Sequence, residues 1–248
     1  MSGWALVLLT LSLLLLPWAC ERAASPARRA GTKPEIHGFL RVAGVLNSIY
    51  CLVWHQLSTD GRAPLPEVGP AILISNHTCG IDHMLLQSKS RRLLGFMVAR
   101  EYYEWKWIHW LCRYIGCIPV NRDGRDFAAT RAAMRALKAG RVLPIFPEGH
   151  IVPASGRRLD PMKPGTAYLA VHAQVPVIPA YIYGTPETNE IIESLITPSR
   201  ARVVFGEPID LSGIARQRAG DKEVQAEVSE RFKQAFLALQ ARALSIVE

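Results

Sequence analysis

Short apolar runs and amphipathic stretches alternate along the chain from about residue 61 to its end. Apolar runs bounded by turn residues are typical of buried strands, and apolar positions three or four apart are typical of helices. The predicted strands are 71–75, 95–99, 117–120, 142–146, 177–182 and 202–205. The predicted helices are 82–88, 104–114, 127–139, 165–172 and 222–247. This alternation predicts an α/β fold with a mixed, largely parallel sheet flanked by helices.

The first apolar stretch, residues 4–20, contains no charge and is slightly shorter than the ~20 residues that span a bilayer. No basic residue precedes it, whereas several arginines and one lysine follow within residues 22–33. We therefore predict an uncleaved membrane anchor with the rest of the chain on the cytoplasmic side. A cleaved signal peptide is the alternative interpretation.

The second apolar stretch, residues 36–57, follows a linker rich in Ala, Pro, Gly and Arg at 23–34. Its apolar positions have helical spacing, and Tyr50 and Trp54 suit the headgroup level of a membrane. We predict that it lies in the membrane interface or forms a re-entrant hairpin. In the alternative interpretation, it packs on the following domain as an ordinary amphipathic helix. Residues 1–60 are accordingly predicted to be a helical membrane-associating region.

The most informative polar segment follows the predicted strand 71–75 and contains His77 and, five positions on, Asp82. A turn from strand to helix brings the Asp82 carboxylate back to the His77 ring, and one carboxylate on one ring nitrogen leaves the other nitrogen as a base. In the alternative interpretation, Asp82 only caps the helix and His77 is a surface residue. Cys79, within the same turn, is either a nucleophile or a small filler residue.

Three further segments lie at predicted strand ends, where sites gather in α/β folds. The strand from Gly116 delivers Arg122, whose guanidinium suits a phosphate. Phe146-Pro147-Glu148-Gly149 ends another strand, and Gly149 permits close backbone approach to an anion. Glu148 is predicted either to hold Arg122 or to accept from a substrate hydroxyl. Residues 175–179 form an apolar strand bracketed by prolines, with a structural role.

Charge and cysteine content narrow the possible functions. The net charge of +8 indicates an anionic partner, and the absence of long basic clusters argues against nucleic acid. The five cysteines form no Cys-x-x-Cys pair, so we expect reduced thiols and neither a disulfide framework nor a metal site.

These four segments, in this order and spacing, resemble the glycerolipid acyltransferase family of the 1-acylglycerol-3-phosphate acyltransferase type. Asn76, His77 and Asp82 match its first block, and Gly116, Ile118 and Arg122 match its second. Residues 146–149 match the third block, 175–179 match the fourth, and Lys163 lies in a Lys-x-Gly-x-Ala turn between them. The resemblance covers about residues 65–210.

The resemblance implies that residues 61–248 are a catalytic domain that transfers an acyl group from acyl-CoA or acyl carrier protein to a lysophospholipid hydroxyl. The expected acceptor is 1-acyl-sn-glycerol 3-phosphate, giving phosphatidic acid. His77 is then the general base and Asp82 orients it. Asn76, Gly116, Arg122, Lys163 and residues 146–149 bind substrate. No metal and no cofactor beyond the acyl donor are implied. Backbone N–H groups of the helix turn after Cys79 are expected to stabilise the oxyanion.

One departure concerns the acceptor headgroup. The third block of the family usually continues with Thr and often Arg, whereas here it continues with His150 and Ile151. Arg157, Arg158 or Lys163 would restore positive charge, or His150 would contact a different headgroup. Transfer to another lyso-lipid, such as an amino-acid-derived one, and a non-catalytic membrane protein are therefore the alternative functions.

Overall fold

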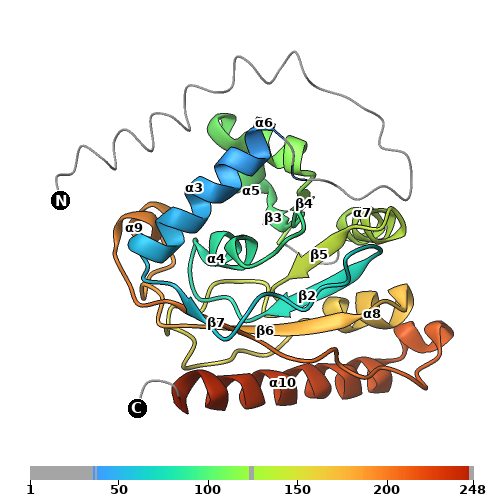
Figure 1. Ribbon diagram of the computed structural model, residues 1–248. Helices are drawn as coiled ribbons and strands as arrows, with labels where there is room; N and C mark the ends of the chain where they lie inside the picture. The colour runs from blue at the N-terminus through green and yellow to red at the C-terminus, as the bar shows by residue number, and fades with distance from the viewer. Residues whose placement is uncertain (1–35, 37, 123–125, 246–248) are drawn as a thin grey trace.

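The computed structural model describes residues 36, 38–122 and 126–245 (Figure 1). Its main sheet has five strands in the order β1-β7-β6-β2-β5. These are β1 (Ser58–Thr59), β2 (Ala71–Ser75), β5 (Val142–Ile145), β6 (Val177–Tyr183) and β7 (Arg202–Phe205). All neighbours are parallel except β6 and β7, so the predicted mixed, largely parallel sheet is confirmed.

The interior strand β2, between β6 and β5, is buried at all five positions, as expected for a strand covered on both faces. Ile72 and Ile74 face one core cluster, and Ala71 and Leu73 face the other. Because β2 and β5 are parallel, with Ile74 paired to Ile145, their carboxyl ends reach the same edge of the sheet. This register brings the residues after 75 close to those after 145.

A small parallel sheet extends the fold beyond β5. It consists of β3 (Met97–Ala99) and β4 (Ile118–Val120), and a single bridge joins Leu94 to Val142 of β5. Between these two strands the chain forms α5 (Arg100–Tyr103) and α6 (Lys106–Ile115). We predicted one helix over 104–114. The chain instead breaks at Trp105, whose backbone is extended with ψ 122°.

Helices cover both faces of the main sheet (Figure 1). One face is covered by α7 (Phe127–Lys138), α8 (Pro164–Ala173) and α10 (Lys222–Ser245). Phe232 and Phe236 of α10 are fully buried in that cluster, which agrees with the predicted sheet-covering role of the last helix. The other face is covered by α4 (Asp82–Ser88) and α3 (Phe39–Val53). The short α9 (Ile191–Ile196) and the 3-10 helix η2 (Arg216–Gly220) were not predicted.

The N-terminal region is described only from its second apolar stretch onward. The predicted anchor at 4–20 lies outside the described residues. The stretch 36–57 contains one helix, α3, which packs on α4 through buried Cys51 and through Asn47, whose Nδ2 donates to the Met84 carbonyl at 2.9 Å. Its outer face leaves several apolar side chains exposed: Val42, Val45, Ile49, Leu52 and Val53.

No helix in 36, 38–122 and 126–245 combines the length and the apolarity needed to cross a membrane. The boundary near residue 60 between a membrane-associating region and a catalytic domain stays a prediction.

Candidate active site

His77 and Asp82 meet at the carboxyl end of β2. The His77 Nδ1–H donates to Asp82 Oδ2 at 2.8 Å, across the turn that leads into α4. Asp82 is fully buried, and the His77 side chain is 19% exposed. Ile81, and not Asp82, occupies the N-cap position of α4, so the carboxylate points back to the turn. This is the geometry that the His77–Asp82 spacing predicted.

The Asp82 carboxylate has further donors that fix its orientation. Oδ2 accepts from the Thr78 N–H at 2.5 Å and the Cys79 N–H at 3.0 Å, and Oδ1 accepts from Thr78 Oγ1 at 2.6 Å. Thr185 Oγ1 in turn donates to Thr78 Oγ1 at 2.8 Å. These donors fix the carboxylate with Oδ2 against His77 Nδ1, which places the ring proton on Nδ1. Nε2 is left with a lone pair.

The same contacts affect two predicted roles of this turn. The N–H groups of Thr78 and Cys79 donate to Asp82, so they are not available to an oxyanion in this arrangement. The oxyanion role predicted for the N–H groups after Cys79 stays a prediction. Burial, together with the charge of Asp82, raises the pKa of the Cys79 thiol. A buried thiol with a raised pKa is a poor nucleophile, and Cys79 therefore fits the filler interpretation.

Residues after β5 frame the base. The Phe146 ring stacks on the His77 ring at 4.1 Å between centroids and 12° between planes. The His77 N–H donates to Glu148 Oε1 at 3.4 Å, and the His77 carbonyl accepts from the Val152 N–H at 2.9 Å. The ring and both backbone polar groups of His77 are thus in contact with one turn.

Glu148 is the other carboxyl group beside His77. It is 1% exposed, and burial raises its pKa to about 8. Its Oε2 has no hydrogen-bond partner among the described residues. A carboxyl group in this environment is held mainly as the neutral acid at pH 7, with Oε2 as the hydroxyl oxygen.

Gly149 and Lys163 lie against each other at this turn. Gly149 has a φ of 72°, so any larger residue there would strain the backbone, and a Cβ would be 2.6 Å from Lys163 Cε, so the flexible Lys163 side chain would have to move. Lys163 precedes α8, and its N–H donates to the Pro147 carbonyl at 2.8 Å. The structure therefore brings Pro147, Gly149 and Lys163 together on the turn whose Glu148 contacts His77, and their role in substrate binding stays a prediction.

Arg122 has a different neighbourhood. It lies beyond β4, is 44% exposed, pairs with Glu101 at 3.4 Å and lies over the Tyr102 ring at 5.4 Å. Among the described contacts, none joins it to Glu148, so the interpretation in which Glu148 holds Arg122 has no support in this arrangement.

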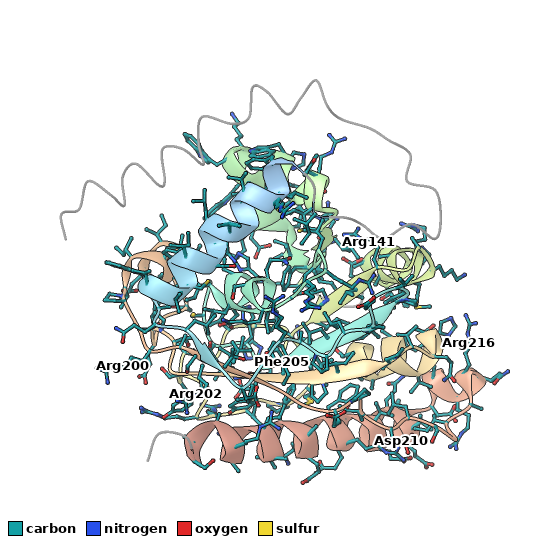
Figure 2. The ribbon with its side chains drawn as sticks, in the orientation of Figure 1. Arg141, Arg200, Arg202, Phe205, Asp210 and Arg216 are labelled. Atoms are coloured by element: carbon teal, nitrogen blue, oxygen red, sulfur yellow. The ribbon has the colours of Figure 1, made fainter. Side chains whose placement is uncertain are left out.

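Two other predicted substrate residues, Asn76 and Gly116, have structural roles in the fold. The Asn76 side chain donates to the Ile182 carbonyl at 2.9 Å and accepts from the Ile182 N–H at 2.7 Å, which fastens the end of β2 to β6. Gly116 has a φ of 77° and ends α6, with its N–H donating to the Arg113 carbonyl at 3.1 Å. Arg141, at the start of β5 (Figure 2), packs where a Cβ of Gly116 would lie.

His150 contacts the turn itself and the loop before α8. Its Nδ1 lies 2.9 Å from the Glu148 carbonyl oxygen and its Nε2 lies 2.9 Å from Asp160 Oδ2. Asp160 also pairs with Arg158 at 3.0 Å, while Arg157 pairs with Glu187 at 3.6 Å. Within the described part of the chain, no group of three or more His, Cys, Asp or Glu side chains is placed to hold a metal ion.

Comparison with known proteins identifies the family of the chain. The family model described as Acyltransferase matches residues 56–183, more than half of the 248 residues, and this range includes both His77 and Glu148. The chain belongs to the Acyltransferase family.

Two named relatives align with part of this chain. A 1-acyl-sn-glycerol-3-phosphate acyltransferase of Streptococcus pneumoniae is 29% identical over 148 residues, which are 58% of this chain and 52% of the relative. A lyso-ornithine lipid O-acyltransferase of Rhodobacter capsulatus is 33% identical over 95 residues, 38% of this chain and 33% of that one. The chain thus matches about half or less of the length of these relatives.

A solved structure shares the fold. The crystal structure of a 1-acyl-sn-glycerophosphate acyltransferase from Thermotoga maritima has a TM-score of 0.60 to this chain at 21% identity. The match covers 95% of this chain and 96% of the other.

Sequence reasoning missed several residues of this acyltransferase site. Thr185 and Asp160 reach the site from segments far along the chain, and nothing in the sequence pattern pointed to them. Thr78 was within the recognised turn, where a hydroxyl four residues before an aspartate was the available signal.

Proposed function

We propose that the chain transfers a fatty acyl group from a thioester of coenzyme A or acyl carrier protein to the free hydroxyl of a lysophospholipid. The observation that carries this proposal is the His77–Asp82 pair, in which Nδ1 is held by a buried carboxylate and Nε2 keeps its lone pair. An imidazole held in this tautomer is suited to take a proton from a hydroxyl group.

In the proposed reaction, His77 Nε2 takes the hydroxyl proton while the hydroxyl oxygen attacks the thioester carbonyl. The carbon–sulfur bond then breaks, an ester bond has formed, and the proton passes from the imidazolium to the leaving thiolate. Asp82 stabilises the imidazolium between these steps. A thioester is already activated, so one base is sufficient and no covalent intermediate on the protein is required.

The proposed acceptor is 1-acyl-sn-glycerol 3-phosphate, and the product is phosphatidic acid. The name of the Streptococcus pneumoniae relative supports this acceptor. Lys163 beside Gly149, and Arg122 beyond β4, are the proposed phosphate contacts, because an ammonium and a guanidinium both pair with phosphate.

A second candidate is transfer to an amino-acid-derived lyso-lipid. It is favoured by the Rhodobacter capsulatus relative, which is a lyso-ornithine lipid O-acyltransferase, and by His150 with its Asp160 partner in the third block. In that reaction the same base acts, and only the headgroup contacts differ.

A screen of acceptors tests both candidates. Purified full-length protein is incubated with acyl-CoA or acyl carrier protein and with lysophosphatidate, lyso-ornithine lipid or other lysophospholipids, and products are read by mass spectrometry. We expect the fastest acylation with lysophosphatidate. Preference for lyso-ornithine lipid selects the second candidate, and no thioester consumption with any acceptor contradicts the proposal.

We also propose that the enzyme works at a membrane surface, with its catalytic domain on the cytoplasmic side. The outer face of α3 presents apolar side chains, and Trp107 of α6 is 72% exposed, which suits the interfacial position of tryptophan. Salt weakens electrostatic attachment but not apolar burial, so we expect the full chain to stay with membranes after a high-salt wash. Removing residues 1–34 should loosen attachment without ending it. Release by salt alone contradicts this proposal.

A further inference from the structure

A cavity of about 530 Å³ lies at the carboxyl end of β6, and three arginines line it: Arg157, Arg200 and Arg202. The other lining residues are uncharged: Gln56, Ser58, Ser155, Tyr183 and Gly184. Among the described residues that line this arginine cavity, none is acidic. Three cations around one hollow repel one another, so the cavity favours an anionic ligand, and guanidinium groups suit a phosphate in particular.

Two of the arginines come from the start of β7. Ala201 between them is fully buried, and residues two apart on an extended chain lie on the same face, so Arg200 and Arg202 share a face. Arg202 is held in place, because its Nε donates to Ser58 Oγ at 3.1 Å and its Nη1 donates to the Ala243 carbonyl at 2.8 Å. The Arg200 side chain makes no hydrogen bond or ion pair with any residue that the structure describes. Its donors are therefore available to a ligand.

The third arginine is carried by a fixed turn. Ser155 has a φ of 47°, a left-handed conformation that is uncommon for residues other than glycine. Its Oγ donates to the Thr185 carbonyl at 2.7 Å, and its own carbonyl accepts from the Gly184 N–H at 3.0 Å. The Arg157 side chain is 68% exposed and pairs with the exposed Glu187 at 3.6 Å. An exposed pair of this kind is weak, so a bound anion can replace Glu187.

The arginine cavity lies on the same edge of the sheet as His77, but two strands away. β2 and β6 are parallel neighbours, so their carboxyl ends share this edge, and Tyr183 at the end of β6 pairs with Arg202 of β7. With about 4.8 Å between neighbouring strands, β2 and β7 are roughly 10 Å apart. The His77 ring stacks on Phe146, which follows β5 on the other side of β2, and this adds to its separation from the cavity.

This separation distinguishes the two phosphate-bearing substrates of the proposed reaction. In lysophosphatidate, four bonds join the reacting hydroxyl oxygen to phosphorus, so at ~1.5 Å per bond the phosphate lies within about 6 Å of the base. A phosphate that close to His77 is expected beside Lys163, on the β5 side. In acyl-CoA, roughly a dozen bonds of the pantetheine arm separate the thioester from the first phosphorus, which is enough to cover ~10 Å.

We propose that the arginine cavity binds the phosphate groups of the acyl donor, coenzyme A. This inference rests on the proposed function, because the thioester at the other end of the donor must reach His77. The donor then approaches the base from the β7 side of the sheet edge, and the acceptor approaches it from the β5 side. Arg200 supplies a new contact on binding, and Arg202 is already held in place by Ser58.

Calorimetric titration of the full-length protein tests the cavity without any activity. The probes are coenzyme A and pantetheine, which has the same arm but no phosphate. Wild type should bind coenzyme A more tightly than pantetheine. Arg200→Gln should weaken the binding of coenzyme A about ten-fold, the scale of one charge-assisted hydrogen bond, and leave pantetheine unaffected. Equal affinity of wild type for both probes, or unchanged affinity of Arg200→Gln for coenzyme A, overturns the proposal.

Arg216→Gln is the matched control. Arg216 lies in η2, on the opposite side of the molecule from Arg200 and Arg202 in Figure 2. The substitution removes the same charge far from the cavity, so the affinity for coenzyme A should stay unchanged. A loss as large as that of Arg200→Gln would show a response to net charge and would contradict a specific site.

Steady-state kinetics then identify which substrate supplies the phosphate. With lysophosphatidate as acceptor, Arg200→Gln should raise the KM for acyl-CoA about ten-fold and leave the KM for lysophosphatidate unchanged. Acyl-pantetheine, a donor without phosphate, should be used equally well by wild type and Arg200→Gln. A rise in the KM for lysophosphatidate alone would mean that the cavity binds the acceptor, and the assignment to the donor would be wrong.

Membrane lipids are another source of phosphate, and sedimentation with vesicles separates them from the donor. The vesicles contain phosphatidylcholine with or without phosphatidylglycerol. If Arg200→Gln weakens binding to the anionic vesicles and leaves coenzyme A binding intact, the cavity serves lipid headgroups and the proposal is wrong. If no acceptor is acylated by wild type, the proposed function fails, while the calorimetry still decides whether the cavity binds coenzyme A.

Discussion

The two predicted contact regions of this acyltransferase, the His77–Asp82 centre and the Arg122 loop, are built in opposite ways. Asp82 is buried and accepts three N–H or O–H donors besides His77, whose own backbone is held by the turn after β5. Arg122 is 44% exposed, with one ion pair and one aromatic ring as its described contacts. The difference suggests that proton transfer uses a preorganised site, whereas headgroup recognition uses a cation that is free to change partners on binding.

The sharpest test of the rigid region is Asp82→Asn. If the amide oxygen replaces Oδ2, the amide NH2 faces Thr78 Oγ1, which can accept, so the fold is retained. The charge that stabilises the imidazolium is lost, and we expect kcat to fall about 10²-fold with little change in the KM of either substrate. Steady-state kinetics measure this, with Asp210→Asn as control. A fall in acceptor affinity at unchanged kcat would place Asp82 in recognition.

For the Arg122 loop, Arg122→Lys keeps the charge and removes the planar pair of donors. If Arg122 binds the acceptor phosphate, the loss of a charge-assisted contact should raise the KM for lysophosphatidate by about one to two orders of magnitude. The KM for acyl-CoA should change little, and Arg216→Lys in η2 is the control. A rise in the donor KM alone would assign Arg122 to the donor, and no change in either would make it an ordinary surface residue.

The sequence predicted contacts between residues that are close along the chain and missed contacts between distant residues. His77 and Asp82 are five residues apart on one turn, so their pairing followed from spacing, and the strand 71–75 was predicted with its observed ends. A largely parallel sheet was expected, with site residues at its strand ends, but only the structure shows that β2 and β5 are neighbours and that Glu148 contacts His77.

Contacts that depend on tertiary packing were not predictable from these patterns. Arg122 pairs with Glu101 of α5, and His150 pairs with Asp160, because separate segments of the chain meet in space. Asn76 looked like a substrate residue because it precedes His77, but its amide binds the backbone of Ile182, more than 100 residues away. Only the tertiary structure shows which polar groups already have hydrogen-bond partners within the protein.

A further expected effect concerns the free energy of unfolding and not the rate of transfer. Burial raises the pKa of Glu148 from its ordinary 4.5 to about 8, so the folded protein holds a proton that the unfolded chain has released. Stability from this group is present below pH 4.5 and is lost as pH rises through 8. Glu148→Gln has no such proton to lose. Its free energy of unfolding should therefore rise relative to that of wild type by about 1.4 kcal/mol per pH unit between pH 4.5 and 8.

Denaturant unfolding at pH 4, 6 and 8 measures this difference. Glu187→Gln serves as the control, because Glu187 is exposed. A constant difference between Glu148→Gln and wild type across this range would contradict a buried neutral acid beside His77.

The central claim is that His77 takes the proton of the acceptor hydroxyl. The most direct test is the rate at which His77→Ala forms diacyl product from acyl-CoA and lysophosphatidate, measured by mass spectrometry beside wild type and His172→Ala. The account predicts a loss of about 10³-fold or more for His77→Ala, with retained circular dichroism and little loss for His172→Ala. Near wild-type product formation by a folded His77→Ala protein would contradict it.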